Sequence, residues 1–472
     1  MALAVKAAIA VLAVGLAAVA GLVPAAGAAA AESSGPGTQL WVSRYNGLGN
    51  GSDGARSVAV SPDGNTVYVT GYTDVSSLNY DYGTVAYNAA TGAQLWASQY
   101  GPDNGSYAAQ VAVSPDGKEV FVTGRSTGQG SNYDYATVAY DAASGAQLWS
   151  ERYNGAASNY DAAAALAVSP GGQTVFVTGT SWSATSGEDY VTIAYDAATG
   201  AQLWITSYNG PGNRNDVADS VAVAPGGDAV YVTGTSQDAS SGYDYATVAY
   251  SASTGTQLWL GRFSSALGLN FAAALAVSPT TGAVFVTGYS KASATFADYA
   301  TISYDGATGA QLWIRRYNGP ANGNDQATAL AVSPDGDSVF VTGESSGSHG
   351  LDYATVGYDA ATGARLWARR YNGPANGDDT PNSVTVSPDS STVYVTGSSQ
   401  GVFSGTGYDY ATAAYGATNG ARLWAKRYNG PGNVNDMANS VAVSLATGTV
   451  FVTGLSGGSG SSADDATIAY HG

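Results

Sequence analysis

The sequence of 472 residues contains no cysteine, only two histidines and few charges, 11% of all residues. The lack of cysteine excludes a disulfide framework, thiolate metal ligands and a cysteine nucleophile. Basic residues are scarce as well, since 17 Lys and Arg stand against 35 Asp and Glu and give a formal net charge of −18. Nucleic acids and anionic membrane surfaces require a basic face, so we expect neither to be a partner.

Only one long apolar run is present, and it lies at the amino end. Lys6 precedes the run Ala7–Val23, Pro24 ends it, and the small residues Ala29–Ala31 follow. This order is typical of a cleaved secretory signal, so the sequence predicts a signal peptide over residues 1–31 and a secreted, extracellular protein. An uncleaved membrane anchor is the alternative. No other stretch reaches the ~18 apolar residues of a spanning helix, which predicts no membrane span after cleavage.

The remainder of the chain is one unit repeated eight times. The tripeptide Val-Thr-Gly recurs at intervals of 53 to 57 residues and ends at Gly71, Gly124, Gly179, Gly234, Gly288, Gly343, Gly397 and Gly454. The motif Asp-Tyr-Ala-Thr-Val-Ala-Tyr, or a close variant, begins at Asp81, Asp134, Asp189, Asp244, Asp298, Asp352, Asp409 and Asp464. The dipeptide Leu-Trp contributes Trp41, Trp96, Trp149, Trp204, Trp259, Trp313, Trp367 and Trp424. Such self-similarity indicates a repeat architecture.

Four segments of each repeat are expected to be strands. In the first full copy they are Ser57–Ser61, Thr66–Tyr72, Asp81–Asn88 and Ala93–Tyr100, rich in Val, Thr, Tyr and Ala and bounded by Gly, Pro and Asp. The second and third segments carry bulk on both faces, as strands do in sheets covered on both sides. Four-stranded units of about 50 residues, stacked radially, predict an all-β protein of the β-propeller type.

The two ends of the chain predict how the ring closes. A Leu-Trp segment, Gln39–Tyr45, precedes the first full repeat, and the last repeat stops at Tyr470 without one. We therefore expect the amino-terminal strand to pair with the last blade, which hides two sheet edges. The prediction is a single eight-bladed β-propeller of four-stranded blades over residues 37–472, monomeric and closed without a disulfide. An open solenoid is the alternative.

The repeat resembles two known repeats. The segment Ala194–Trp204, with its Thr-Gly turn and a Trp four residues beyond the Gly, resembles the tryptophan-docking repeat of quinoprotein (PQQ)-like eight-bladed propellers. The longer unit, seen in Tyr317–Asp325, Val341–Gly343 and Asp352–Val356, resembles the repeat of bacterial exported β-propeller proteins. The resemblance implies that the eight Leu-Trp tryptophans are structural and wedge between blades. It implies little about activity.

The resemblance also implies an enzymatic alternative. Quinoprotein dehydrogenases hold pyrroloquinoline quinone and calcium over the channel, and several use a vicinal cysteine pair that this chain lacks. Catalysis needs one asymmetric set of groups, whereas the Asp residues here recur in every repeat. We therefore predict no catalytic residue and no cofactor, with calcium as the one ion to consider, and keep a PQQ- and calcium-dependent dehydrogenase as the alternative.

The recurring acids and bases permit two interpretations each. The eight Asp of the third segment, and a second set formed by Asp53, Asp161, Asp216, Asp325, Asp379 and Asp436, are expected to accept loop N–H groups at strand starts. A weaker interpretation is a calcium-binding rim. Eight basic residues lie in the fourth segment of repeats five to seven, namely Arg315, Arg316, Arg365, Arg369, Arg370, Arg422, Lys426 and Arg427. There they would deter edge-to-edge pairing or form a docking patch for an anionic partner.

Aromatic residues in the loops between the second and third segments suggest a binding face. The candidates are Tyr80, Tyr133, Trp182, Tyr243, Phe296, His349, Phe403 and Tyr408. Trp182 is the only tryptophan outside the repeat motif. Aromatic loops on a rigid scaffold suit carbohydrate or peptide ligands. The sequence therefore predicts a secreted, non-catalytic binding or structural scaffold whose ligand is a carbohydrate, a peptide or a cell-wall component.

Overall fold

The computed structural model describes residues 35–472 except 77–78, 103–104, 129–131, 241, 292–295, 402–406 and 459–461. The predicted signal peptide and Phe403 lie outside the described residues. Within them the secondary structure is strand, with 32 strands and no helix. In this part of the chain, no helix has the length and hydropathy needed to cross a bilayer.

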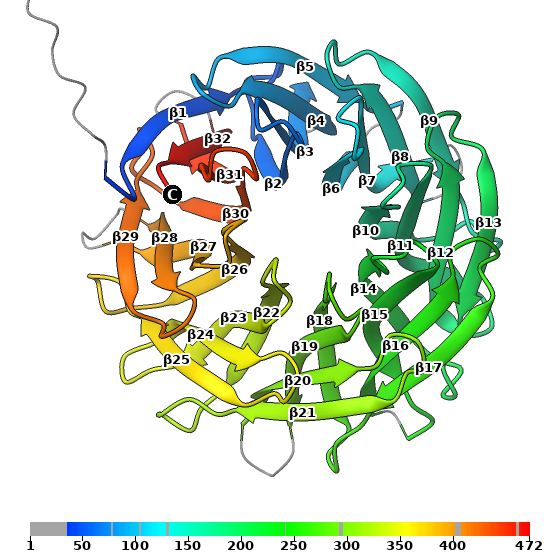
Figure 1. The fold of residues 1–472 in the computed structure, drawn as a ribbon. Helices are drawn as coiled ribbons and strands as arrows, with labels where there is room; N and C mark the ends of the chain where they lie inside the picture. The colour runs from blue at the N-terminus through cyan, green and yellow to red at the C-terminus, as the bar shows by residue number, and fades with distance from the viewer. Residues whose placement is uncertain are drawn as a thin grey trace, which may run out of the picture. The chain divides into compact units, whose positions relative to one another are not determined.

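The strands follow the sequence repeat, four to a repeat, and Figure 1 shows them arranged around a common centre. The first strand of each repeat is innermost: β2 (Gly54–Val60), β6 (Ser106–Val113), β10 (Asp161–Val168), β14 (Asp216–Val223), β18 (Leu269–Val277), β22 (Asp325–Val332), β26 (Asp379–Val386) and β30 (Asp436–Val443). The second strands are β3 (Thr66–Ser76), β7 (Glu119–Thr127), β11 (Thr174–Ser183), β15 (Ala229–Gln237), β19 (Val284–Lys291), β23 (Ser338–Ser346), β27 (Thr392–Gln400) and β31 (Val450–Gly457).

The third and fourth strands lie progressively further from the centre (Figure 1). The third strands are β4 (Asn79–Asn88), β8 (Tyr133–Asp141), β12 (Gly187–Asp196), β16 (Tyr243–Ser251), β20 (Asp298–Tyr304), β24 (Leu351–Asp359), β28 (Tyr408–Gly416) and β32 (Ala463–Tyr470). The fourth strands are β5 (Gln94–Tyr100), β9 (Gln147–Tyr153), β13 (Gln202–Tyr208), β17 (Gln257–Phe263), β21 (Gln311–Tyr317), β25 (Arg365–Tyr371), β29 (Arg422–Tyr428) and, for repeat eight, β1 (Gln39–Tyr45).

Antiparallel pairing joins the four strands of each repeat. Within the described residues the strands form seven sheets, of which six have four strands and one has eight. The eight-stranded sheet consists of repeats four and five, joined by one parallel pair between Tyr243 and Leu269. The expectation of antiparallel four-stranded units is therefore confirmed, although the number of sheets is seven.

The leading strand pairs with the trailing one, as expected from the ends of the sequence. β1 runs antiparallel to β32, with Trp41 opposite Ala469 and Tyr45 opposite Asp465. Just before this ladder, the Gly37 N–H donates to the carbonyl of His471 at 2.7 Å. In the sheet order β1-β32-β31-β30, repeat eight is thus built from both ends of the chain.

Packing between repeats explains the Thr-Gly-x-x-x-Trp motif. The eight Leu-Trp tryptophans are 5–9% exposed, and the Trp149 indole N–H donates to the Ala197 carbonyl of the next repeat at 2.7 Å. The turn glycine of that next repeat, Gly200, has φ of +75°, and a Cβ atom there would lie 2.8 Å from the Trp149 ring. Glycine is therefore required both by the turn and by the tryptophan that packs on it.

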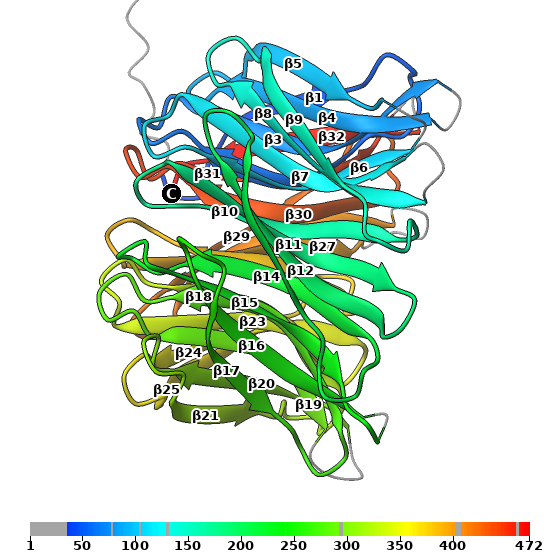
Figure 2. The same cartoon turned by 90° about the vertical axis from the view of Figure 1, so that its right-hand side faces the viewer.

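Tyrosines of the third strands make a second connection between repeats. The Tyr135 hydroxyl is buried and donates to the Val191 carbonyl of the next repeat at 3.2 Å. Val175, Val177 and Ile193 of repeat three pack with Tyr135 and Trp149 in one hydrophobic cluster. Figure 2 shows the sheets of successive repeats, such as β7–β9 and β10–β12, stacked on one another. Each sheet is thereby covered on both faces, which accounts for the bulky residues on both sides of these strands.

Candidate functional site

A β-bulge in every innermost strand turns one residue out of the ladder. The register between first and second strands shifts at the same place in all eight repeats. The bulged residues are Arg56, Ala109, Ala164, Asp219, Ala273, Thr328, Asn382 and Asn439. The sequence prediction started the first strand at Ser57, whereas β2 begins at Gly54, because a bulge is not visible as an interruption of the sequence pattern. Bulges commonly redirect side chains next to binding sites.

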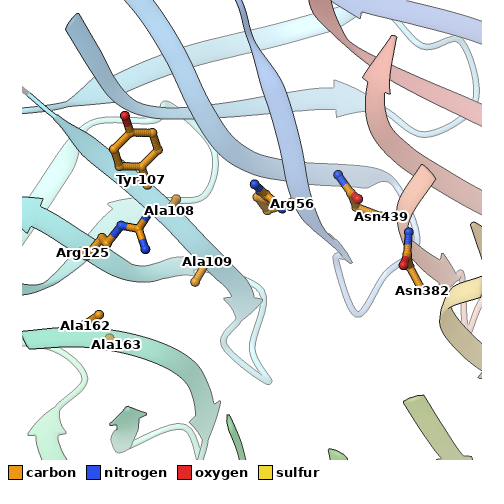
Figure 3. A pocket seen from close by; sticks show the side chains of 9 residues that line it. All are labelled: Arg56, Tyr107, Ala108, Ala109, Arg125, Ala162, Ala163, Asn382 and Asn439. Carbon is orange, nitrogen blue, oxygen red and sulfur yellow. The ribbon is translucent and has the colours of Figure 1, made fainter. Parts of the chain in front are cut away.

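Three of the bulged polar residues and one further arginine line a central pocket of about 480 Å³. Its wall comes from the innermost strands of repeats one, two, three, seven and eight, together with Arg125 of β7. Figure 3 shows Arg125 and Tyr107 on one side of this pocket, Asn382 and Asn439 on the other, and Arg56 between them in this view. The lining contains two guanidinium groups and no carboxylate.

The two arginines are held by aromatic rings. The Arg125 guanidinium carbon lies 5.0 Å from the Tyr107 ring centre and 5.1 Å from that of Tyr133, and Nη1 donates to the Tyr160 hydroxyl at 3.2 Å. Its Nε is buried and has no hydrogen-bond partner among the described groups. Arg56 lies over Tyr72 at 5.9 Å. Among the described residues neither arginine forms an ion pair.

Five tyrosines form a continuous arc beside the two arginines, which we call the tyrosine arc: Tyr72, Tyr80, Tyr107, Tyr133 and Tyr160. Neighbouring ring centres lie 5.4 Å apart for Tyr72 and Tyr80, 5.5 Å for Tyr80 and Tyr107, 6.3 Å for Tyr107 and Tyr133, and 6.0 Å for Tyr133 and Tyr160. These distances are those of favourable aromatic pairs. The arc therefore presents a packed aromatic surface across repeats one to three.

The two asparagines are fixed in orientation by their amide groups. Asn439 Nδ2 donates to the Ala55 carbonyl and Asn382 Nδ2 to the Ala438 carbonyl, both at 2.7 Å. Each bond joins neighbouring repeats, and that of Asn439 joins repeat eight to repeat one. The asparagines thus brace the wall opposite Arg125.

Two acidic residues with raised pKa values, Asp219 and Glu344, lie in repeats that do not line the pocket. Asp219, the bulged residue of repeat four, is half-buried, and the surrounding protein raises its pKa to about 7 through desolvation. Burial, together with the charge of Asp378, raises the pKa of Glu344 in repeat six. Neither acid lines the central pocket. These two acids thus lie in repeats four and six, whereas the two arginines of the pocket lie in repeats one and two.

The eight Asp that begin the third-strand motif differ from expectation. Six are paired with an arginine of the fourth strand: Asp134 with Arg152, Asp244 with Arg262, Asp298 with Arg316, Asp352 with Arg370, Asp409 with Arg427 and Asp464 with Arg44. Guanidinium groups bind these six carboxylates, a partner that the sequence interpretation did not include. Asp81 and Asp189 have no arginine at the matching position, where Gln99 and Ser207 stand. Burial raises the pKa of both carboxyls.

The second set of acids behaves as expected. Each accepts the N–H of a glycine six residues earlier, as Asp161 does from Gly155 at 2.8 Å. The same bond is made by Asp53, Asp216, Asp325, Asp379 and Asp436. In the part of the chain that the structure describes, no group of three His, Cys, Asp or Glu side chains could hold a metal ion.

The basic residues of repeats five to seven also have specific partners. Arg316, Arg370 and Arg427 pair with third-strand Asp of their own repeats. Arg315 donates from Nε to the Gly363 carbonyl of the next repeat at 2.7 Å, and Arg369 likewise to Gly420 at 2.9 Å. The side chains of these five arginines therefore fold back onto protein acceptors, a role that the sequence interpretation did not include.

The predicted aromatic binding face is divided by the structure. Tyr80 and Tyr133 belong to the tyrosine arc, and Tyr243 packs separately on Phe271 with ring centres 4.9 Å apart. Trp182 lines a different pocket in repeat three. Phe296 is 54% exposed, His349 is exposed and Tyr408 is half-buried, and none of them lines the central pocket.

Sequence reasoning missed Arg56, Arg125, Tyr107, Asn382 and Asn439. Their signal was present as a departure from the repeat, because the bulged position holds alanine in three repeats. Likewise the residue after Val-Thr-Gly is Arg only at Arg125. Comparing the eight copies column by column would have identified both positions.

The quinone and cation expected from quinoprotein-like propellers fit only in part. The two guanidinium groups suit the carboxylates of such a quinone. A calcium ion needs clustered oxygen ligands, and the pocket lining offers no carboxylate. The residues therefore do not fit the quinone and cation together, and we derive no reaction step through them.

Comparisons with known proteins agree with this architecture. Among solved structures the chain is similar to Saccharomyces cerevisiae Sqt1, with 11% identity, TM-score 0.57, and 92% of this chain and 99% of that one covered. It is similar to a quinohemoprotein alcohol dehydrogenase from Pseudomonas putida HK5, with 14% identity, TM-score 0.54, and coverage of 92% and 76%. A europium-containing methanol dehydrogenase gives 12% identity, TM-score 0.52, and coverage of 92% and 93%. At such identities these likenesses concern the fold alone.

Comparison of the sequence with family models shows the family as well as the fold. No curated protein matches the chain. A family model described as outer membrane protein assembly factor BamB matches residues 25–181, 81–242 and 193–463, which together span nearly all the repeats. On this match the chain belongs to the BamB-type family of PQQ-like β-propeller repeat proteins.

Proposed function

We propose that the protein is an exported, non-catalytic binding scaffold whose central pocket holds an anionic group of its ligand. In this proposal the repeats form eight blades, since the eight-stranded sheet divides into two four-stranded halves joined by a single residue pair. The observation that carries the proposal is the pair of arginines, Arg56 and Arg125, which line one pocket and have no carboxylate partner among the described residues.

Charge makes these arginines unusual in this chain. Acids outnumber bases by 35 to 17, and six other arginines are paired with carboxylates. Two guanidinium groups held instead by aromatic rings keep their donors available for a ligand. A guanidinium binds a carboxylate through two parallel N–H donors, so a carboxylate is the group that this pocket suits best.

The tyrosine arc supports a ligand with flat faces next to its carboxylate. Aromatic surfaces beside a few fixed polar groups are typical of carbohydrate and peptide sites. An acidic sugar unit would place its carboxylate between Arg56 and Arg125 and its ring against Tyr107. A peptide carboxyl terminus offers the same charge without a sugar ring, so the two ligand classes can be separated by experiment.

Calorimetric titration of the mature protein with a trimer of galacturonic acid, and separately with an acetylated tripeptide, tests the proposal. Arg125→Ala and Arg56→Ala should each weaken binding of the preferred probe roughly tenfold to a hundredfold, because hydrogen bonds to charged groups contribute about 1.5–3 kcal/mol. Arg365→Ala, on the exposed start of β25, removes the same charge outside the pocket and should leave binding unchanged. If neither probe binds, or if all three variants bind alike, the proposal is wrong.

The class alternative is a PQQ-dependent dehydrogenase. Two of the similar structures are named as alcohol or methanol dehydrogenases, and two arginines in one pocket suit a polycarboxylate quinone. Titration with pyrroloquinoline quinone, with and without calcium, distinguishes the two functions. Binding of the quinone followed by reduction of an artificial electron acceptor with an alcohol would favour the enzyme over the scaffold.

A further inference from the structure

An arginine of the fourth strand connects three strands in six of the eight repeats. In repeat two, Arg152 Nη2 lies 2.8 Å from Asp134 Oδ2 and 2.9 Å from the Ser126 carbonyl, while Nη1 donates to Ser126 Oγ at 2.8 Å. In repeat four, Arg262 makes the corresponding contacts with Asp244 and Ser236. It also donates to the hydroxyl of Tyr208, from the preceding repeat, at 2.6 Å. A guanidinium thus has a fixed set of acceptors at this place in the fold.

Repeat three keeps the acceptors but lacks the arginine. Ser207 pairs with Val191 in the same register in which Arg152 pairs with Ala136. The acceptors are present in their usual places, with Asp189 on the third strand, Ser181 on the second and Tyr153 on the preceding repeat. Repeat one also lacks the arginine, but Gln99 stands there and its Nε2 lies 3.5 Å from the Tyr45 hydroxyl.

A pocket of about 360 Å³ occupies the place of the missing side chain in repeat three. Its lining includes Tyr153, Ser181, Asp189 and Ser207, which are the acceptors and the substituted position, and also Trp182. The loop between β9 and β10 that borders it contributes only the small residues Ala156 and Ala157. The pocket thus opens next to an indole ring.

The carboxylate in this pocket has no cationic partner among the described residues. Asp189 Oδ2 accepts a hydrogen bond from the neutral Ser186 hydroxyl at 2.7 Å. Oδ1 is buried without a hydrogen-bond partner, as it is in Asp134, Asp244 and Asp409. In those three residues, however, the other oxygen binds a guanidinium. Asp189 is therefore a half-buried carboxylate whose charge no described residue neutralises.

We propose that this pocket binds a guanidinium group supplied by a ligand, in place of the arginine that six other repeats supply themselves. The ligand class is a peptide with an arginine side chain. The acceptors are a carboxylate, a serine hydroxyl and carbonyl, and a tyrosine hydroxyl, and together they match the fork of guanidinium donors. Trp182 adds an aromatic face on which a cation can lie. The inference is independent of the central pocket and of its proposed anionic ligand.

The experiment titrates the full mature chain with Nα-acetyl-arginine amide and with Nα-acetyl-lysine amide by calorimetry. The arginine probe should bind with one site per chain and at least tenfold more tightly than the lysine probe, which lacks the planar fork. Asp189→Asn should weaken arginine binding at least tenfold. The matched variant Asp228→Asn removes one exposed carboxylate of repeat four and should leave binding unchanged.

Two further variants exchange the features of repeats two and three. Ser207→Arg should fill the pocket with the chain's own guanidinium, abolish binding of the probe and raise the melting temperature. Arg152→Ser should free the matching acceptors in repeat two and add a second, weaker probe site, because Thr127 stands there in place of Trp182. Ser207→Leu fills the space without a charge and keeps the test valid if the arginine variant does not fold. Equal binding of the two probes, or wild-type binding by both Ser207 variants, would overturn the proposal.

Discussion

The contacts between repeats use the same residues in nearly every repeat, whereas the bulges of the innermost strands differ in residue from one repeat to the next. Between repeats the same groups recur, so that a tryptophan, a turn glycine and a buried tyrosine occupy equivalent places nearly everywhere. At the bulge of the innermost strand the residues differ, from arginine through alanine to aspartate. The uniform positions hold the ring together, while the variable positions give it one chemically distinct pocket. Stability and ligand choice are therefore expected to respond to different substitutions.

The junction between repeats eight and one is the exception among the connections. Seven repeats have a buried tyrosine after the third-strand Asp, whereas repeat eight has Asp465 there. This carboxyl is buried, and burial, with the nearby charges of Asp53 and Asp464, raises its pKa well above the usual range. In place of the tyrosine bond, the Trp41 indole N–H of β1, which donates to the Ala89 carbonyl, and the Asn439 amide connect these repeats.

Removal of residues 35–46 should have the largest effect on stability. It deletes β1, exposes the edge of β32 and removes Trp41, whose loss alone would cost about 3–5 kcal/mol. Calorimetry should show a much lower melting temperature, and light scattering should detect association through the open edge. A variant lacking only residues 32–36 is the control. Unchanged melting after loss of β1 would contradict the role given to this strand.

A tryptophan pair separates the uniform positions from the variable ones. Trp149→Ala removes a buried ring that packs on Gly200 and Phe121 and donates to Ala197, so the free energy of unfolding should fall by about 3–5 kcal/mol. Trp182→Ala makes the same change at a half-buried position near the end of β11 and should cost less than about 1 kcal/mol. Denaturant unfolding of both variants measures the difference. Equal losses would show that the two regions do not differ in stability.

The sequence predicts the residues that connect the repeats well, because their motifs recur along the whole chain. The pairing of Gln39–Tyr45 with the last repeat follows from a missing Leu-Trp segment, and the structure has β1 at these residues. The pocket could not be read in this way, since its lining comes from five repeats and depends on a bulge that leaves no mark on strand periodicity. The arginine–aspartate pairs were missed although both partners recur at a constant separation of 18 residues within repeats two, four, five, six and seven. The sequence does not show which way these arginine side chains point. In the structure they fold across the third strand rather than toward solvent.

Asp465 predicts a pH dependence of the closing junction. The folded state favours the protonated carboxyl, whereas in the unfolded chain the group ionises near pH 4. The contribution of Asp465 to the free energy of unfolding is therefore most favourable below that pH. This contribution falls as the pH rises toward the folded-state pKa. Asp465→Asn removes this loss, so its melting temperature should exceed that of the wild type at pH 7 and match it at pH 3.5. A difference independent of pH would mean that the carboxyl is not held protonated.

Ionisation of Asp219, at the bulge of repeat four, should also lower stability as the pH rises, but by less than ionisation of Asp465 does. Its pKa of about 7 arises from desolvation alone, and the half-buried side chain keeps partial contact with water, which limits the cost of ionisation. Because the raised pKa favours the protonated folded state, stability should decrease between about pH 4 and pH 7. Asp219→Asn should flatten this part of the melting profile while leaving binding at the central pocket unchanged, since Asp219 does not line that pocket. A variant that altered ligand affinity as strongly as Arg125→Ala would show that the acids and the arginines act on one ligand, and the separation of charges around the centre would then be part of the binding site.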